Sequence, residues 1–463
     1  MKTIAKFLFV LLSTLMIQSC SDDHDDSGNF SFTVDFDLPT SIVKSVGDIL
    51  SYSPVVSPSE NITYAWYLDN EMISTDCGLN YTLTKTGIFT LRFEAKSSDT
   101  MAYRESILTV NKVANSFTPK EYVTKAIGFF DMDMGDPSTI NWGNITHLVL
   151  SSAIVQADGS IKYPFEGSAE KVKNIVDEAH SNGVYVMLQI AGEHNAIQGN
   201  CKFGSTNFYN VAIDDTRKNA FIEELYNYVH TNGLDGINIY MDKKGSNTTG
   251  YPDKDKLVDF YRKMAEAKPE KSIAEHEFYL TMNLHAGSFT TKGHQDDFVA
   301  LEGYDWYYLW VFGIPTTSAG MHADPEQIKK ELTYWRDTKG KSLDKFVITC
   351  SSIVALYDFS KVGGKENVTD DNLSKCTTFI KYSALFSMFP ELTPKEIAGK
   401  NKLDKEGYDA VRYDGLPWIE TKVNIKFVHG FDVGGFALWK IDFDSQDPET
   451  SVMNYIRKML NNH

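Results

Sequence analysis

The sequence predicts an α/β fold, a TIM (β/α)8 barrel, preceded by a small all-β sandwich of immunoglobulin-like size. Over residues 121–463, apolar runs typical of buried strands alternate with amphipathic helical runs. Eight strand–helix units fit within that stretch, which is the number that closes such a barrel. Residues 30–113 instead carry short runs of alternating polarity between turn residues, without helical periodicity.

Composition sets the broad class of the protein. The chain has 463 residues, of which 42% are hydrophobic and 13% aromatic, enough for one large and one small core. A formal net charge of -17 argues against nucleic acid as a partner. The five cysteines form no C-x-x-C pair and no metal-ligand spacing, so we expect no metal and no cofactor. A Cys350–Cys376 disulfide remains open.

Residues 1–20 carry an export signal. Lys2 and Lys6 precede an apolar run, Phe7–Ile17, that is too short to span a membrane. The run ends at Ser19 and Cys20, a pattern that resembles a bacterial lipoprotein signal. The resemblance implies cleavage before Cys20 and lipidation of its side chain. The alternative is an ordinary signal peptide that contains a cysteine by chance.

Residues 21–29 form an acidic tether that is too polar to fold alone. An acidic stretch directly after a lipidated cysteine resembles the export signal of surface lipoproteins in glycan-degrading Gram-negative bacteria. The resemblance implies a lipid anchor in the outer membrane, with the protein on the cell surface.

The domain of residues 30–113 is expected to be a spacer. Its predicted strands are Phe30–Phe36, Ile62–Leu68, Ile88–Ala95 and Ser106–Val113. The second run is centred on Trp66 and has the pattern of an inner sandwich strand. The domain resembles the PKD-type modules of bacterial surface proteins. A direct role in sugar binding is the alternative, and residues 114–120 read as a linker.

The barrel of residues 121–463 has eight predicted strands. They are Lys125–Phe130, His147–Ile154, Tyr185–Ile190, Leu234–Met241, Phe278–His285, Asp305–Phe312, Phe346–Ser351 and Gly435–Ile441. One intervening helix is predicted by the apolar stripe that starts at Leu257, and another covers Glu170–His180. Ligands of such barrels bind at the carboxyl ends of the strands.

The fourth predicted strand carries the chemistry that organises the barrel. Its side chains alternate, so that apolar residues share one face: Ile237, Ile239 and Met241. The opposite face carries side chains that can form hydrogen bonds: Asn238, Tyr240 and Asp242. A barrel strand whose outer face packs on helices and whose inner face opens on a pocket needs this pattern.

This stretch resembles the signature of family 18 glycoside hydrolases, D-G-x-D-x-D-x-E. Asp235 and Gly236 match it. In the family the final Glu protonates the glycosidic oxygen, and the preceding Asp steadies the substrate acetamido group, which acts as nucleophile. Here Asn238 replaces the first inner Asp, Tyr240 the assisting Asp, and Asp242 the Glu.

Other strands extend the resemblance. The family's third strand ends S-x-G-G, and here Gln189 stands for the Ser. Its sixth strand carries M-x-Y-D, matched by Trp310-Val311-Phe312-Gly313, so Phe312 lacks the hydroxyl and Gly313 the carboxylate. The eighth strand keeps the family's terminal tryptophan as Trp439. In the family, this tryptophan forms the floor of the subsite that holds the sugar before the cleaved bond.

These replacements predict a pseudoenzyme with no catalytic residue. Asp242 is one methylene shorter than Glu, which sets its oxygen back by about 1.5 Å. Misplacement on that scale can cost about a hundredfold in rate. Tyr240 stays neutral near neutral pH, because an unperturbed phenol has a pKa of about 10. The rival interpretation is an active endo-β-N-acetylglucosaminidase that uses Asp242 as its acid.

The predicted site is a sugar-shaped groove. Aromatic rings stack on the C–H faces of sugars, and the candidates near the strand ends are Trp310, Phe312 and Trp439. The candidate hydrogen-bonding residues are Gln189, Asn238, Tyr240 and Asp242. Trp306 and Tyr308 are set deeper, where filling of the barrel core is the better interpretation.

The family resemblance implies a glycan ligand that contains N-acetylglucosamine, either chitin-type oligomers or N-glycans. It also implies a context of polysaccharide utilisation, in which surface lipoproteins capture glycans beside an outer-membrane glycan transporter. A structural or adhesive surface protein without a sugar site is the remaining alternative.

Overall fold

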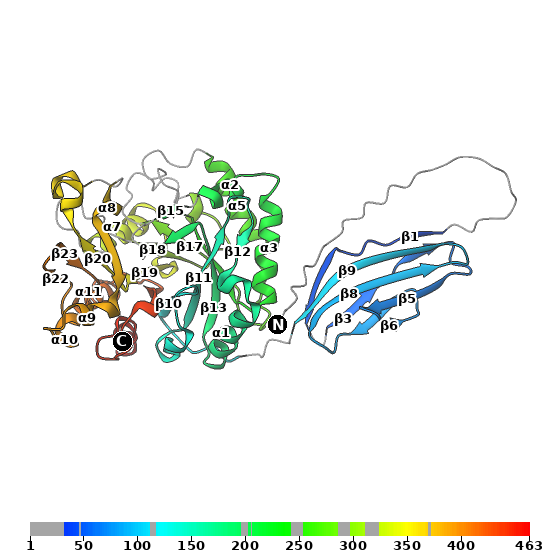
Figure 1. The fold of residues 1–463 in the computed structure, drawn as a ribbon, viewed down its shortest axis with the longest axis horizontal. Coiled ribbons are helices and arrows are strands. Elements are labelled where there is room, and N and C mark those ends of the chain that lie inside the picture. The colour runs from blue at the N-terminus through cyan, green and yellow to red at the C-terminus, as the bar shows by residue number, and fades with distance from the viewer. Residues whose placement is uncertain are drawn as a thin grey trace, which may run out of the picture. The chain divides into compact units, whose positions relative to one another are not determined.

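The structure is a computed structural model (Figure 1). It describes residues 32–45, 48–111, 117–195, 202–204, 206–241, 253–285, 297–310, 324–368 and 372–463. The chain divides into two compact units at Val110 and Asn111. The predicted export signal with Cys20 and the acidic tether lie outside the described residues. Within the described ranges, no helix has both the length and the apolar character needed to cross a bilayer.

The first unit is all-β, as predicted. Its strands are β1 (Thr33–Asp35), β2 (Ser41–Ser45), β3 (Ile49–Tyr52), β4 (Val55–Ser57), β5 (Thr63–Leu68), β6 (Glu71–Ser74), β7 (Leu79–Thr82), β8 (Gly87–Lys96) and β9 (Met101–Asn111). They form an antiparallel sheet in the order β2-β9-β8-β5-β6 and two antiparallel pairs, β1–β4 and β3–β7. Trp66 of β5 is fully buried and stacks on Tyr52, with ring centroids 5.7 Å apart.

The second unit contains the predicted TIM barrel. Its eight parallel strands are β10 (Lys125–Asp131), β11 (His147–Val155), β13 (Tyr185–Ala191), β16 (Gly236–Tyr240), β17 (Tyr279–His285), β18 (Trp306–Trp310), β19 (Phe346–Ser351) and β24 (Gly435–Trp439). They pair in the order β10-β24-β19-β18-β17-β16-β13-β11, and β11 pairs with β10 to close the ring. Each predicted barrel strand coincides with one of them over the described residues.

Three short strands lie beside the barrel near its carboxyl end. β12 (Ile161–Lys162) pairs antiparallel with the end of β11. β14 (Glu193–Asn195) follows β13 closely and pairs with β15 (Lys202–Gly204) as a separate hairpin.

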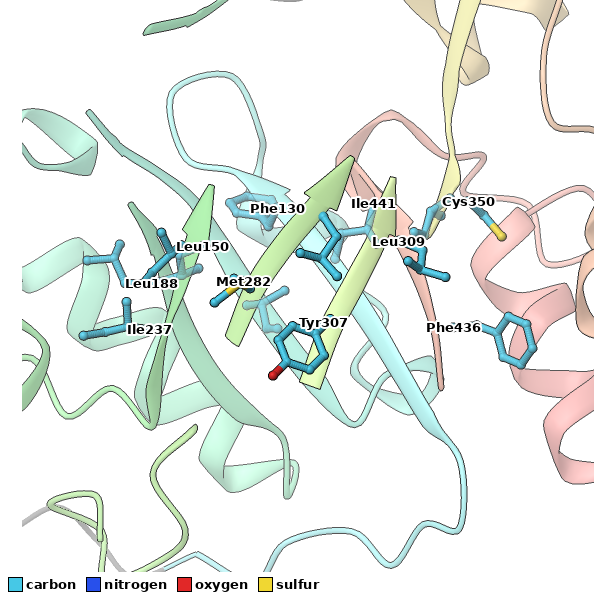
Figure 2. Packing of buried hydrophobic residues seen from close by; sticks show 14 of the residues in the cluster. Phe130, Leu150, Leu188, Ile237, Met282, Tyr307, Leu309, Cys350, Phe436 and Ile441 are labelled. Atoms are coloured by element: carbon cyan, nitrogen blue, oxygen red, sulfur yellow. The ribbon is translucent and has the colours of Figure 1, made fainter. Parts of the chain in front are cut away.

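Helices cover the outside of the barrel. They are α1 (Ala169–Ser181), α2 (Thr206–Ala212), α3 (Lys218–Thr231), α5 (Lys254–Glu266), α7 (Pro325–Thr333), α11 (Leu416–Phe427) and α12 (Val452–Asn461). The apolar outer faces of the strands pack under them in one continuous core, part of which Figure 2 shows. α1 contains the predicted helix Glu170–His180 and is capped by Asn182. The next residue, Gly183, has φ of +68°, and a Cβ there would lie 2.7 Å from the Thr118 carbonyl oxygen.

An α+β insertion between β19 and β24 was not predicted. Its strands are β20 (Ile353–Tyr357), β21 (Thr377–Lys381), β22 (Lys402–Lys405) and β23 (Tyr408–Arg412), joined in the antiparallel order β21-β20-β23-β22. It also contains the short helices α8 (Leu373–Cys376), α9 (Leu385–Met388) and α10 (Pro394–Ala398). Cys350 and Cys376 are both buried and neither is bonded to another cysteine, so the disulfide left open does not form in this structure.

The amino-terminal end of the barrel is closed by aromatic residues and by the incoming chain. Phe117 stacks on His180, with centroids 4.1 Å apart and planes 6° from parallel. His180 Nε2 lies 2.8 Å from the Asp235 carboxylate, which also accepts the Val186 N–H at 2.9 Å. Asp235 therefore ties α1 and β13 to the start of β16, at the end of the barrel opposite to the ligand-binding end.

Candidate functional site

The alternation predicted for β16 is present in the described residues. Ile237, Ile239 and Met241 belong to the core between the strands and the helices. Asn238 and Tyr240 contact side chains that point into the barrel from neighbouring strands. Asp242, the third predicted member of the inner face, lies outside the described residues.

A chain of hydrogen bonds crosses four strands inside the barrel. Ser152 Oγ donates to Gln189 Oε1 at 2.7 Å, and Gln189 Nε2 donates to Asn238 Oδ1 at 2.8 Å. Asn238 Nδ2 then donates to Asn283 Oδ1 at 2.9 Å and to Thr281 Oγ1 at 3.1 Å. Gln189 and Asn238, both predicted site residues, are thus in direct contact, and every side chain in this network is neutral.

An aromatic layer lies at the carboxyl ends of the strands. Tyr240 and Trp310 are stacked, with centroids 5.0 Å apart and planes 16° from parallel. Trp310 meets Trp439 edge to face at 4.4 Å, and Phe129 packs on both tryptophans. Tyr240, Trp310 and Trp439 are 4%, 3% and 1% exposed. The structure therefore brings three predicted site residues together in one aromatic cluster, whereas Phe312 lies outside the described residues.

The deeper aromatic residues fill the barrel. Trp306 and Tyr308 are almost fully buried and belong to the inner core with Phe129, Val149 and Met187. This placement agrees with their interpretation as core-filling residues.

An ionic group lies where the first and last barrel strands meet. Lys440 Nζ is 2.5 Å from Asp131 Oδ2, 3.5 Å from Ser151 Oγ, and 4.7 Å from the centroid of the Trp439 ring. Asp442 Oδ1 accepts the backbone N–H of Asp131 at 3.0 Å. Asp442 Oδ2 is buried and has no hydrogen-bond partner among the described residues.

The two carboxylates of this group titrate differently. Burial alone would raise the pKa of Asp131, but Lys440 and the N–H groups of Asp133 and Met134 hold that pKa below its usual value. Burial, together with the nearby Asp131 carboxylate, raises the pKa of Asp442 to about 6. The mouth thus contains one stable anion and one carboxyl group that takes up a proton in mildly acidic solution.

Sequence comparison decides the family. The family model for glycosyl hydrolases family 18 matches residues 121–444, and the PKD-like domain model matches residues 33–97. The chain belongs to glycosyl hydrolases family 18. A comparison with curated proteins gives no match.

Solved structures of family 18 folds resemble the chain at low identity. A chitinase from Bacteroides thetaiotaomicron has a TM-score of 0.55 and 19% identity, over 73% of this chain and 98% of the chitinase. A chitinase-like agglutinin from Robinia pseudoacacia has a TM-score of 0.52 and 16% identity, over 72% and 99%. Human YKL-39 is described as a pseudo-chitinase with retained chitooligosaccharide binding. It has a TM-score of 0.53 and 15% identity, over 73% of this chain and 100% of YKL-39. At these identities the likeness shows the fold alone.

The two inner acid positions of the family 18 motif that the structure describes hold neutral side chains. Asn238 stands at the first inner acid, held by an amide and a hydroxyl, and Tyr240 stands at the assisting acid, stacked on Trp310. Gly313, at the position of the sixth-strand Asp, lies outside the described residues together with Asp242.

Several residues at this mouth were not singled out from the sequence. Thr281 and Asn283 follow the parity of β17, but their bonds to Asn238 depend on the strand register. The Asp131–Lys440 pair depends on the closure of the barrel, which brings β24 beside β10. Closure of the ring could have signalled this pair, because Asp131 directly follows one predicted strand and Lys440 lies next to the end of another, and the ring makes these two strands adjacent.

The structure contains no evidence for a metal centre in the part of the chain that it describes. No three His, Cys, Asp or Glu side chains gather there as ligands. Asp131 and Asp136, in the acidic loop after β10, accept backbone N–H groups two residues ahead and so shape the loop.

Proposed function

We propose that this protein is a non-catalytic glycan-binding member of family 18, which captures N-acetylglucosamine-containing glycans at the mouth of its barrel. The candidate contact residues are Gln189, Asn238, Tyr240, Asp242, Trp310, Phe312 and Trp439. The ligand is a chitin-type oligomer or an N-glycan, bound for uptake and degradation by other proteins.

One observation carries the proposal: the position of the assisting acid is occupied by a neutral ring. Tyr240 stacks on Trp310 at 5.0 Å, so no carboxylate stands at this position to orient and charge-balance an acetamido nucleophile. Asn238 is also neutral, and its amide nitrogen donates hydrogen bonds to Thr281 and Asn283. Both changes remove the chemistry of the motif, and both leave aromatic faces and amides that suit sugar binding.

The comparisons support binding without hydrolysis as an outcome that this fold permits. One of the similar structures, human YKL-39, carries a description of that kind, a pseudo-chitinase with retained chitooligosaccharide binding. For this chain the same outcome remains our inference from its residues.

We further propose that Cys20 carries the lipid that anchors the protein to the outer membrane, facing outward, beside a glycan transporter. The motif around Cys20 and the acidic residues 21–29 support this location. Protease treatment of intact cells is expected to remove the protein, and protection of the protein would contradict the location.

Calorimetry and product analysis test the function together. The mature chain, purified in detergent, is titrated with chitotetraose and with a free N-glycan, and each mixture is then analysed for shorter sugars. We expect saturable binding of at least one ligand without release of product. Product release that the substitution Asp242→Asn abolishes would instead establish the rival hydrolase.

A matched pair of variants locates the binding. Trp310→Ala removes one face of the aromatic stack, whereas Trp335→Ala removes a buried tryptophan outside the inner core of the barrel. Each variant is compared with the wild type after its folded fraction is measured by circular dichroism. Equal loss of affinity in the two variants would show that the stack is not part of the site.

A further inference from the structure

The hydrogen-bond chain inside the barrel ends on a donor that nothing accepts. Asn283 Oδ1 accepts from Asn238 Nδ2 at 2.9 Å. Asn283 Nδ2 is buried and has no partner among the described residues, and the residue is 8% exposed. A buried donor left without an acceptor is destabilising, so such a group needs an explanation.

Neighbouring bonds fix the direction of this chain, and with it the donor character of its last group. Thr281 Oγ donates its only hydrogen to the Ile237 carbonyl oxygen at 3.3 Å. Thr281 Oγ can therefore only accept from Asn238, which orients the Asn238 amide with Nδ2 toward β17. Asn283 must then present its oxygen to Asn238, and its two N–H groups are the ones that remain.

Asn283, whose Nδ2 has no acceptor among the described residues, lies on the strand next to those that carry the stacked rings of Tyr240 and Trp310. β17 pairs with β16 on one side and with β18 on the other. Tyr240 comes from β16 and Trp310 from β18, and their rings stack at 5.0 Å. Asn283 therefore stands on the strand between the two strands that carry the stacked rings.

We propose that Asn283 is a ligand-binding residue, whose Nδ2 donates a hydrogen bond to the carbonyl oxygen of an N-acetyl group on the bound glycan. This inference rests on the proposed function and makes it more specific. A hydroxyl group could also accept from Nδ2, but it brings its own hydrogen, which would need a further acceptor in this buried site. A carbonyl oxygen accepts from one of the two N–H groups and adds no hydrogen that would need an acceptor of its own.

The first experiment needs no variant. The mature chain is titrated with chitotetraose and with cellotetraose, which share the same linkage and differ at the acetamido group. We expect chitotetraose to bind about tenfold more tightly, the usual effect of one hydrogen bond to a buried donor. Equal affinities would overturn the inference while leaving the capture of glycans intact.

The second experiment assigns that preference to Asn283. Asn283→Asp keeps the oxygen that faces Asn238 and turns the free donor into an acceptor, and Asn283→Leu removes the donor without adding charge. We expect both to bring the ratio of the two affinities close to one. A structural role would weaken both ligands equally and preserve the ratio, which would overturn the inference.

Thr349→Val is the matched control, because Thr349 is another buried residue of the barrel whose hydroxyl has no partner among the described residues. It lies beside Ala437 on β24, one inward-facing position below Trp439, so the ratio is expected to stay at its wild-type value. If wild-type protein binds neither these sugars nor any other glycan, the proposed function fails, and the inference fails with it.

Discussion

The two ends of β16 differ in what they keep of the family 18 motif. At the amino end, Asp235 retains the motif's first acid, and its carboxylate binds His180 and the Val186 N–H. At the carboxyl end, Asn238 and Tyr240 replace acids and join a neutral network and an aromatic stack. The acid that ties elements together is retained, and acids that would act on a substrate are exchanged. Positions that hold the fold together and positions at the ligand-binding end can therefore change independently.

Asp235→Ala should have the largest effect on stability. It leaves His180 Nε2 and the Val186 N–H buried without their acceptor, which we expect to lower the free energy of unfolding by about 3–5 kcal/mol. Urea unfolding measures this loss, and calorimetry on the folded fraction should give unchanged glycan affinity. A loss of affinity without loss of stability would erase the distinction between the two ends.

Lys440→Met should have the next largest effect, because it leaves the Asp131 carboxylate half-enclosed without its cation. We expect a loss of about 3 kcal/mol at pH 7. Lys440 lowers the pKa of Asp131 in the folded protein, so the stabilisation is fully present above the unfolded pKa and is lost as the pH falls through the folded pKa. Unfolding curves at pH 7 and pH 3 test this dependence.

Lys426→Met is the control for that variant. Its partner Asp432 is 88% exposed, so the pair should contribute less than about 1 kcal/mol. Equal losses in the two lysine variants at pH 7 would show that burial of the ion pair does not matter here.

Asp442→Asn should stabilise the protein at high pH. The folded pKa of Asp442 is raised to about 6, so the wild type loses stability as the pH rises from about 4 to 6. The variant keeps the acceptor for the Asp131 N–H and carries no charge, so we expect a gain of about 2 kcal/mol at pH 8. The gain should vanish near pH 4, and a gain that is independent of pH would contradict the assignment.

Asn238→Asp should have the smallest effect, although it restores an acid of the family motif. Asn238 is fully buried among neutral groups, so the new carboxyl group should stay protonated and donate to Asn283 Oδ1 in place of the amide. At about pH 4, where the unfolded chain also binds much of that proton, we expect a loss of about 1 kcal/mol. No hydrolysis of chitotetraose should appear, because Tyr240 still occupies the position of the assisting acid. Measurable product from this single variant would show that the carboxyl end is closer to activity than its residues indicate.

The sequence predicted the barrel because each strand is a compact apolar run with its own turn signals. The alternation at Ile237 and Ile239 likewise placed Asn238 and Tyr240 on the inner face. The insertion after β19 was missed, because its strands are short and interrupted by helices of only four or five residues.

Part of the mouth was missed for a different reason. The bonds of Asn283 and the Asp131–Lys440 pair depend on register between strands far apart in the sequence. Lys440 also adopts a left-handed backbone conformation, with φ of +71°, directly after β24, and alternation along a strand does not predict that conformation.

The stacking of Phe117 on His180 has a mechanical consequence. The chain enters the barrel at its amino-terminal end, where the Lys120 N–H also donates to the Gly183 carbonyl oxygen at 2.9 Å. Tension transmitted along the upstream segment is therefore borne by these contacts before it reaches the strands. If the protein is anchored to a membrane as proposed, drag from a captured polymer would be transmitted to the amino-terminal end of the barrel. The carboxyl ends of the strands, where the glycan is proposed to bind, would stay undistorted.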